Sequence, residues 1–182
     1  MTRELMVAQI PSLRRYARAL TGDAWAADDL VQDTLERACS KWRLWVIGSN
    51  LRAWLFSVMH NLFVNQLRQP SGPLRANLVD VDDVAHDLLA PETDPALMLD
   101  LQRCLLRLPP EQREVLLLVS LEDLSYAEVA KITGIPIGTV MSRLSRARSR
   151  LQELMEAPPQ PLVPQAGSND KPARPSALRR LK

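Results

Sequence analysis

One stretch near the end of the chain, residues 137–151, carries side chains that can bind DNA. Arginine can donate a fork of hydrogen bonds to a guanine edge or to a phosphate, while serine and threonine hydroxyls suit phosphate oxygens or bases. The candidate contacts are Thr139, Ser142, Arg143, Ser145, Arg146 and Arg148. These residue types, all outside the apolar positions of the stretch, predict contacts with the backbone and base edges of a double helix.

Two short helices must position these side chains. Ser125, followed three residues later by Glu128, forms a capping box that predicts a helix start, and Gly134 predicts where that helix ends. Pro136 opens a second helix, in which apolar residues recur at steps of three and four and form one stripe. The members of that stripe are Val140, Leu144, Ala147, Leu151 and Leu154. This pattern predicts a helix-turn-helix that binds DNA; a helical hairpin with a solvated arginine face is the alternative.

The composition predicts an all-helical protein. The chain has 182 residues, of which 46% are hydrophobic, 4% are aromatic and six are glycine. Because alternating valine-rich runs are missing, helices are expected to build one ordinary domain or two small ones.

The formal net charge of +2 is unevenly spread. Residues 1–69 carry +3 (nine basic, six acidic side chains), and residues 70–100 carry −6 (one basic, seven acidic). Residues 101–155 carry +2 (eight and six), and residues 156–182 carry +3 (five and two). Basic modules on either side of an acidic segment suit a protein that meets nucleic acid at separated places.

The cysteines and the apolar runs indicate a cellular compartment. Cys39 and Cys104 lie far apart and outside any CxxC pair, so buried free thiols in a reducing cytoplasm are expected. No signal peptide opens the chain, and no apolar run approaches the ~18 residues of a membrane span. We therefore expect a soluble, cytoplasmic protein without membrane insertion.

No pattern in the chain predicts catalysis. There is no serine–histidine pair, glycine-rich phosphate loop or paired-carboxylate site, and His60 and His86 lack plausible partners. Carboxylates at 80–87 surround His86, but such groups in an acidic linker are usually solvated, so no metal site is predicted. We expect neither an enzyme nor a cofactor.

The first half of the chain predicts amphipathic helices with two undecided surfaces. Asp23 and Asn50 are expected to cap the second and third of these helices. The second carries acidic residues and glutamine on one face, which suits either solvated surface or protein docking. The third carries aromatics, two asparagines and a terminal arginine, which suit either a core or unstacked single-stranded DNA. The helices are expected near residues 5–20, 24–43 and 51–68, the third with its core side at Leu51, Leu55, Val58, Leu62 and Gln66.

Prolines divide the chain. The segment from Pro70 to Pro95 lacks a sustained helical stripe and predicts a linker. Asp94 is expected to cap the helix that follows, which should bury Leu97, Leu101, Cys104, Leu105 and Leu108. The predicted fold class is all-α, with two small helical domains joined by a flexible acidic linker. The predicted segments are a first domain at 1–70, a linker at 71–94, a four-helix domain at 95–155 and a disordered, proline-rich, basic tail at 156–182.

Two stretches together resemble a known family. DDLVQDTLERA at 28–38 with NLRAWLFSVMHNLFVNQLR at 50–68, and LPPEQREVLLLVSLEDLSYAEVAKITGIPIGTVMSRLSRAR at 108–148, resemble the sigma-70 family. More narrowly, they are similar to the small extracytoplasmic-function (ECF) sigma factors. The resemblance covers about residues 5–72 and 95–155. It implies two helical promoter-binding domains, called sigma region 2 and sigma region 4.

The resemblance also implies residue roles in region 2. One helix would dock on the clamp helices of bacterial core RNA polymerase through Asp29, Leu30, Gln32, Asp33 and Arg37. Asp33 stands where relatives often carry glutamate. The next helix is similar to the element that melts the −10 region and captures a flipped base, a step that stacking and edge hydrogen bonds can offset. Its candidate DNA contacts are Trp54, His60, Asn61, Asn65 and Arg68.

The basic helix of the helix-turn-helix corresponds to the family's −35 reader. Ser142, Ser145 and Arg146 would face base edges, and the remaining candidates would face phosphates. Met141 stands where many relatives carry lysine or arginine. The chain would thus bind core polymerase, recognise −35 and −10 elements and promote transcription initiation, under the control of an anti-sigma factor. Two alternatives are a sigma mimic that only binds an anti-sigma protein, and a LuxR-like activator that uses the helix-turn-helix alone.

Overall fold

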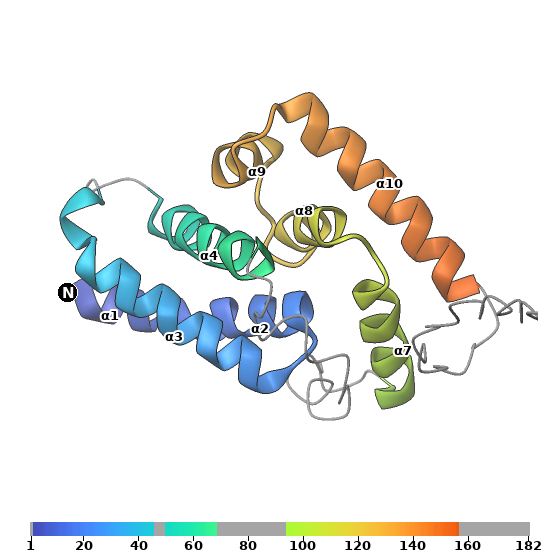
Figure 1. Ribbon diagram of the computed structural model, residues 1–182, viewed down its shortest axis with the longest axis horizontal. Helices are drawn as coiled ribbons and strands as arrows, with labels where there is room; N and C mark the ends of the chain where they lie inside the picture. The colour runs from blue at the N-terminus through green and yellow to red at the C-terminus, as the bar shows by residue number, and fades with distance from the viewer. Residues whose placement is uncertain (1, 46–49, 69–93, 157–182) are drawn as a thin grey trace, which may run out of the picture.

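The computed structural model describes residues 2–45, 50–68 and 94–156, and these residues form helices and no strand (Figure 1). The predicted all-α fold class is therefore confirmed. Most of the predicted linker and tail lies outside the described residues. The elements are α1 (Thr2–Val7), α2 (Ile10–Thr21), α3 (Ala24–Ser40), a 3₁₀ turn η1 (Trp42–Leu44), α4 (Leu51–Arg68), α7 (Pro95–Leu106), α8 (Pro110–Ser120), α9 (Tyr126–Thr133) and α10 (Ile137–Glu156).

Short-range signals in the sequence set most helix ends. The Asp23 carboxylate caps α3 by accepting a hydrogen bond from the backbone N–H of Ala26 at 2.6 Å. Both halves of the capping box between Ser125 and Glu128 are formed at the start of α9. Gly134 ends α9 in the left-handed conformation, with a φ of 69°, which glycine adopts without steric cost. These predicted signals are confirmed.

The predicted first helix is two helices. The chain breaks between α1 and α2 at Ala8 and Gln9, and Pro11 lies in the first turn of α2. Proline has no N–H to donate and its ring clashes with the preceding turn, so a continuous helix cannot run through this position. Proline is tolerated in a first turn, where no intrahelical partner is required, and α2 therefore starts afresh.

The predicted core side of α4 is only partly correct. Leu55 is buried as expected, but Val58 and Gln66 remain partly exposed. The other buried side chains of α4 are Phe56, Met59 and Phe63. The ring of Phe56 packs edge-on against Tyr16 of α2, with centroids 5.1 Å apart. This aromatic contact turns the side of α4 that carries Phe56 toward the core.

Two further burial predictions are wrong. Leu97 of α7 is 52% exposed, whereas Gln102 is fully buried and donates hydrogen bonds to the backbone carbonyls of Arg18 and Ala19 at 3.4 Å. The inner face of α7 therefore packs against the end of α2. Cys104 is buried as predicted, but Cys39 is exposed.

The two halves of the chain pack against each other around one continuous core. Helix α2 contacts α7 and α8, and α4 contacts α9, so α8 lies in the middle of the molecule (Figure 1). At the end of α2, Gly22 has a φ of 74°, and a β-carbon there would lie 2.5 Å from Cδ1 of Leu106. The sequence patterns predict each half but not this close packing between them.

Candidate nucleic-acid interface

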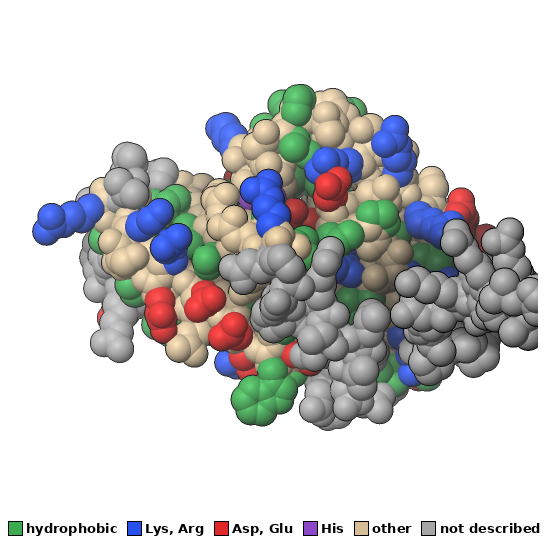
Figure 2. All heavy atoms as spheres, viewed as in Figure 1, with side chains coloured by type: hydrophobic (Ala, Val, Ile, Leu, Met, Phe, Trp, Pro, Cys, Tyr) green, Lys and Arg blue, Asp and Glu red, His purple; other side chains and the backbone are tan. Residues whose placement is uncertain are grey.

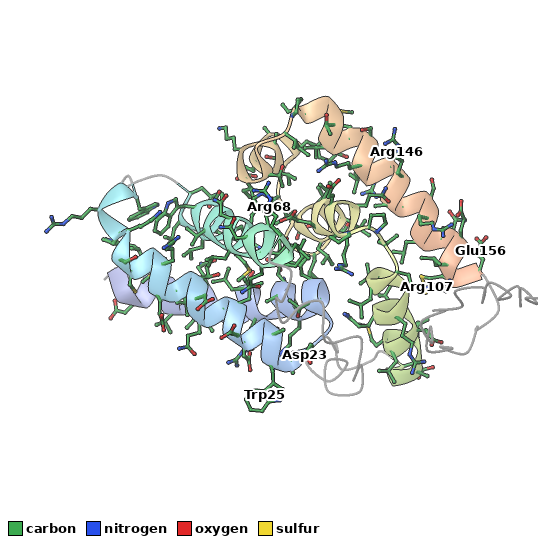
Figure 3. All side chains as sticks on the ribbon, in the orientation of Figure 1. Asp23, Trp25, Arg68, Arg107, Arg146 and Glu156 are labelled. Atoms are coloured by element: carbon green, nitrogen blue, oxygen red, sulfur yellow. The ribbon has the colours of Figure 1, made fainter. Side chains whose placement is uncertain are left out.

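Helix α10 presents its predicted DNA contacts on an open face. Its buried stripe packs against α8 and α9, which turns the opposite side outward. Figure 3 places Arg146 on the outer side of the helix. The exposed candidates are Ser142, Ser145, Arg146 and Arg148. The other two, Thr139 and Arg143, are partly exposed. The structure therefore brings all six predicted −35 contacts to one end of one helix.

One of these candidates already has a charged partner. The guanidinium of Arg143 lies 3.1 Å from the carboxylate of Glu111 at the start of α8, and the Glu111 side chain is 70% exposed. An exposed ion pair of this kind contributes little to stability, so phosphate can replace Glu111 at low cost. In contrast, Arg146 and Arg148 make no ion pair within the described residues.

Helix α4 presents its predicted contacts less evenly. Asn61, Asn65 and Arg68 are exposed, and the amide of Asn61 donates to the Ser57 carbonyl at 2.8 Å. Trp54 is partly buried and packs edge-on against Trp42 with centroids 6.1 Å apart. Three of the five candidates are therefore accessible in this conformation.

His60, the remaining candidate on α4, is held by the second half of the chain. Its Nδ1 forms a hydrogen bond with the carboxylate of Glu114 on α8, and the two side chains are 14% and 6% exposed. The sequence prediction that His60 has no partner is wrong, because the partner lies 54 residues away. In this conformation His60 cannot reach a base.

Four of the five residues predicted to bind polymerase lie on the open side of α3. Asp29, Gln32 and Arg37 are exposed, and Asp33 is partly exposed. Leu30 is fully buried in the core, so its side chain cannot contact a partner, and the prediction for this residue is wrong. Leu30 stands in the motif because its side chain packs α3 into the hydrophobic core.

Acidic side chains dominate this face. Figure 2 shows carboxylates gathered over α3. Partial burial raises the pKa of Asp33, and the neighbouring carboxylates of Asp29 and Glu36 raise it further. A surface depression beside them is lined by Asp33, Glu36, Arg37, Ser40 and Leu62. Such a surface suits a partner that supplies positive charge and an apolar contact.

A buried carboxylate joins the two halves. Glu122, between α8 and α9, has a fully buried side chain that accepts hydrogen bonds from Arg15, Arg52 and the hydroxyl of Ser12. Arg15 also donates to the backbone carbonyl of Leu121 at 3.1 Å. A buried carboxylate is costly unless it is paired and hydrogen-bonded, so this cluster holds α2 and α4 against the helix-turn-helix.

A second contact joins the start of α4 to the start of α9. Asn50 caps α4 by accepting from the N–H of Ala53 at 3.1 Å, and its amide donates to Glu128 at 2.7 Å. Hydrogen bonds from the backbone and hydroxyl of Ser125 lower the pKa of Glu128, with a smaller contribution from Asn50. The capping box of the helix-turn-helix thus also binds the cap of α4.

Comparisons with known proteins decide the family. Residues 6–60 match the family model described as the Sigma2 domain of PhyR, and residues 98–151 match that of Sigma-70, region 4. The chain is 39% identical over 156 residues to the ECF RNA polymerase sigma factor EcfG of Rhodopseudomonas palustris strain TIE-1, covering 84% of each chain. The chain belongs to the ECF RNA polymerase sigma factors.

Further relatives agree with this assignment. The sigma factor is 34% identical over 143 residues to the ECF RNA polymerase sigma factor SigM of Mycobacterium tuberculosis strain H37Rv, covering 79% of this chain and 71% of SigM. Among solved structures, it is similar to the sigma factor RpoE of Bartonella quintana, which was crystallised in complex with the anti-sigma factor NepR. That match has a TM-score of 0.72 and 35% identity, and covers 85% of this chain and 96% of RpoE.

The matches confirm the resemblance seen in the sequence. They span both halves of the sigma factor, which a LuxR-like activator would not explain. Relatives of this kind are transcription regulators rather than enzymes. Within the described residues, no helix is long and apolar enough to cross a membrane, and no cluster of three metal-ligating side chains occurs. The acidic segment at 80–87, for which no metal site was predicted, lies outside the described residues.

Proposed function

We propose that this sigma factor binds core RNA polymerase through the exposed face of α3, reads the −35 element with α10 and opens the −10 element with α4. The observation that carries the proposal is the outer face of α10, where all six predicted −35 contacts stand together on a helix-turn-helix. The second helix of this motif is the one that enters the major groove.

On α10 the contacts divide by chemistry. Arg146 can donate two hydrogen bonds to one guanine, and the hydroxyls of Ser142 and Ser145 can bond to either base type. Thr139, which lies near the helix start, and Arg143 are suited to phosphate. Arg148 lies further along the exposed side and reaches the backbone as the helix leaves the groove. Phosphate contacts set the register, and base contacts set the sequence.

On α4 the contacts suit separated strands. The amides of Asn61 and Asn65 lie one turn apart on the exposed side and can hydrogen-bond to the edges of unpaired bases. Arg68 at the end of the helix can bind the strand's phosphates. The partly exposed ring of Trp54 offers a stacking surface, which is worth about 1–3 kcal/mol per base in single-strand binding.

Simultaneous binding of both promoter elements requires the two halves to separate. By their positions the elements lie roughly 25 base pairs apart, or about 85 Å of duplex at 3.4 Å per base pair. Here α4 contacts α9, and α9 contacts α10. Packed helix axes lie about 8–10 Å apart, so α4 and α10 are separated by only about 20 Å. The described conformation is therefore a closed form, and opening it breaks the Glu122 cluster.

We also propose an anti-sigma partner of the NepR kind, in the cytoplasm where polymerase and chromosome meet. The support is the likeness to Bartonella quintana RpoE, whose structure contains NepR. An inhibitor that binds both halves can keep α4 and α10 from reaching the two promoter elements together. Removal of that inhibitor would then release the factor to polymerase.

Run-off transcription tests this function directly. Purified bacterial core polymerase is mixed with the sigma factor and a pool of promoter fragments from a genome. Specific transcripts that share −35 and −10 sequences are the expected result. Binding to the anti-sigma protein or to core without any transcript would favour a sigma mimic and contradict the proposal.

The variant Arg146→Ala tests the role of α10. It removes one bidentate contact, which is worth about 1–3 kcal/mol, so transcription at limiting holoenzyme should fall at least about fivefold. Arg150→Ala is the matched control, because Arg150 lies on the same helix but pairs with Glu153 at 3.1 Å. Equal transcription from Arg146→Ala and the unmodified factor would show that α10 is not the −35 reader.

A further inference from the structure

Two apolar side chains interrupt the basic face of α10 near its start. Ile137 is 47% exposed, and Met141, one turn further on, is 52% exposed. Both lie outside the buried stripe that contains Val140 and Leu144, so neither is needed to hold α10 in the fold. Because four residues separate them, the two side chains are neighbours on the helix surface.

This apolar pair lies among the proposed DNA contacts. At 3.6 residues per turn, Ser145 and Arg148 continue along the row that Ile137 and Met141 begin, and Ser142 follows Met141 directly. The first residues of a recognition helix are those that reach base edges in the major groove. Met141 therefore stands among the groups that would meet the base pairs.

The major groove offers one apolar group, the 5-methyl of thymine. A thioether side chain is flexible and polarisable, so it adapts to a small apolar surface of this kind. Contact between Met141 and a methyl group would remove apolar area of both partners from water, which is favourable. An arginine in the same place would instead favour the acceptors of guanine.

We propose that Met141, supported by Ile137, determines promoter specificity by recognising thymine methyl groups in the −35 element. This inference rests on the proposed reading of that element by α10. Arg146 and the serine hydroxyls supply the hydrogen bonds to neighbouring base pairs. The Met141 side chain selects thymine at its own base pair by apolar contact rather than by a hydrogen bond.

Replacing thymine by deoxyuridine tests the proposal, because uracil lacks only the methyl group. Holoenzyme is titrated with promoter fragments recovered by run-off transcription, in which each −35 thymine on either strand is replaced in turn. The unmodified factor should lose about fourfold in affinity at one or two positions, the worth of one buried methyl-sized group. Met141→Ala should lose a similar factor on the thymine fragment and show no further loss with uracil at those positions.

Two variants serve as matched comparisons. Met155 is also an exposed methionine of α10, at 46%, but it lies near the other end of the helix. Met155→Ala should leave both the affinity and the dependence on thymine unchanged. Met141→Arg should move the preferred base at the affected pair from thymine toward guanine.

Three results would overturn the inference. These are a −35 element without thymine, full tolerance of uracil at every position, or a thymine dependence that persists in Met141→Ala. If Arg146→Ala still weakened binding in these cases, the −35 assignment of α10 would stand and only the role of Met141 would be wrong. If Arg146→Ala and changes of the −35 sequence both had no effect, the proposed function of α10 would fail.

Discussion

The two helices proposed to contact DNA are held in opposite ways. Helix α10 is packed along one stripe, and Ser142, Ser145, Arg146 and Arg148 on its other side are exposed, with Arg146 labelled in Figure 3. Helix α4 is packed against α3 on one side and α9 on another, and its His60 is bonded to α8. Duplex recognition by α10 is therefore available in the closed form, whereas full use of α4 depends on the contacts that join the two halves.

The largest expected effect comes from Glu122→Gln, which removes the difference between α10 and α4 by loosening the contact that covers α4. The change removes a buried charge that accepts from Ser12, Arg15 and Arg52. Arg15 and Arg52 are 43% and 35% exposed and can return to water, so we expect a loss of about 2–3 kcal/mol in the free energy of unfolding. Urea denaturation measures this loss.

In the same variant, α4 should become accessible to DNA, as α10 already is. Small-angle scattering should show a more extended particle, and single-stranded −10 DNA should bind several-fold more tightly because α4 is uncovered. Glu111→Gln is the control, since Glu111 forms only an exposed pair with Arg143. A variant as compact and as stable as the unmodified protein would show that the Glu122 cluster does not hold the halves together.

A smaller effect is expected from Gly22→Ala at the contact between α2 and α7. The new β-carbon would lie 2.5 Å from Leu106, and alanine is strained at a φ of 74°. Overpacking and backbone strain together should cost about 1–3 kcal/mol. Thermal denaturation of Gly22→Ala, Leu106→Ala and the double variant separates the two causes.

In that set, the double variant should recover the part of the loss that comes from the clash. The part due to the left-handed backbone should remain. If Gly22→Ala were as stable as the unmodified protein, the packing of α7 against α2 would not exist in solution. The two halves would then be joined by the contacts of α2 with α8 and of α4 with α8 and α9.

The smallest effect is expected at Glu128, which caps α9 and binds Asn50 of the other half. Because its pKa is lowered in the folded protein, its stabilisation is present above the ordinary glutamate range. That stabilisation is lost as the pH falls through the lowered pKa. Glu128→Gln should remove this acid-dependent part, worth about 0.5 kcal/mol after solvent screening.

The check is urea denaturation at several pH values between neutral and strongly acidic. Glu153→Gln is the control, because Glu153 makes only an exposed pair with Arg150 on α10. If Glu128→Gln kept the same pH dependence as the unmodified protein, the capping box would contribute nothing to the acid sensitivity of the fold.

Local chemistry explains what could be predicted from the sequence. The caps at Asp23, Ser125 and Gly134 depend on residues within three positions of each other. The apolar stripe of α10 has five members, three or four residues apart. Such signals are complete within one element. The all-α class and the accessible positions of the six candidate residues on α10 follow from them, and family resemblance supplies the motif on α3.

Long-range packing explains what could not be predicted. Glu122 and Ser12 are 110 residues apart, and His60 and Glu114 are 54 apart, so no spacing rule joins them. Leu30 belongs to the family motif but packs in the core, because such motifs mix exposed residues with those that pack beneath them. The spacing of apolar residues does not predict which side of α4 is buried. Phe56 is buried because its ring packs against Tyr16 of α2.

The two halves should separate when the factor engages polymerase and promoter, and energy transfer between them can show it. Leu5 of α1 and Lys131 of α9 are exposed and lie in different halves, so cysteines placed there can carry a donor and an acceptor dye. The exposed Cys39 and the buried Cys104 are replaced first. Energy transfer should be high in the free factor and fall when core polymerase and promoter DNA are added. High transfer that persists while transcripts are made would contradict an opening that moves α4 away from α10.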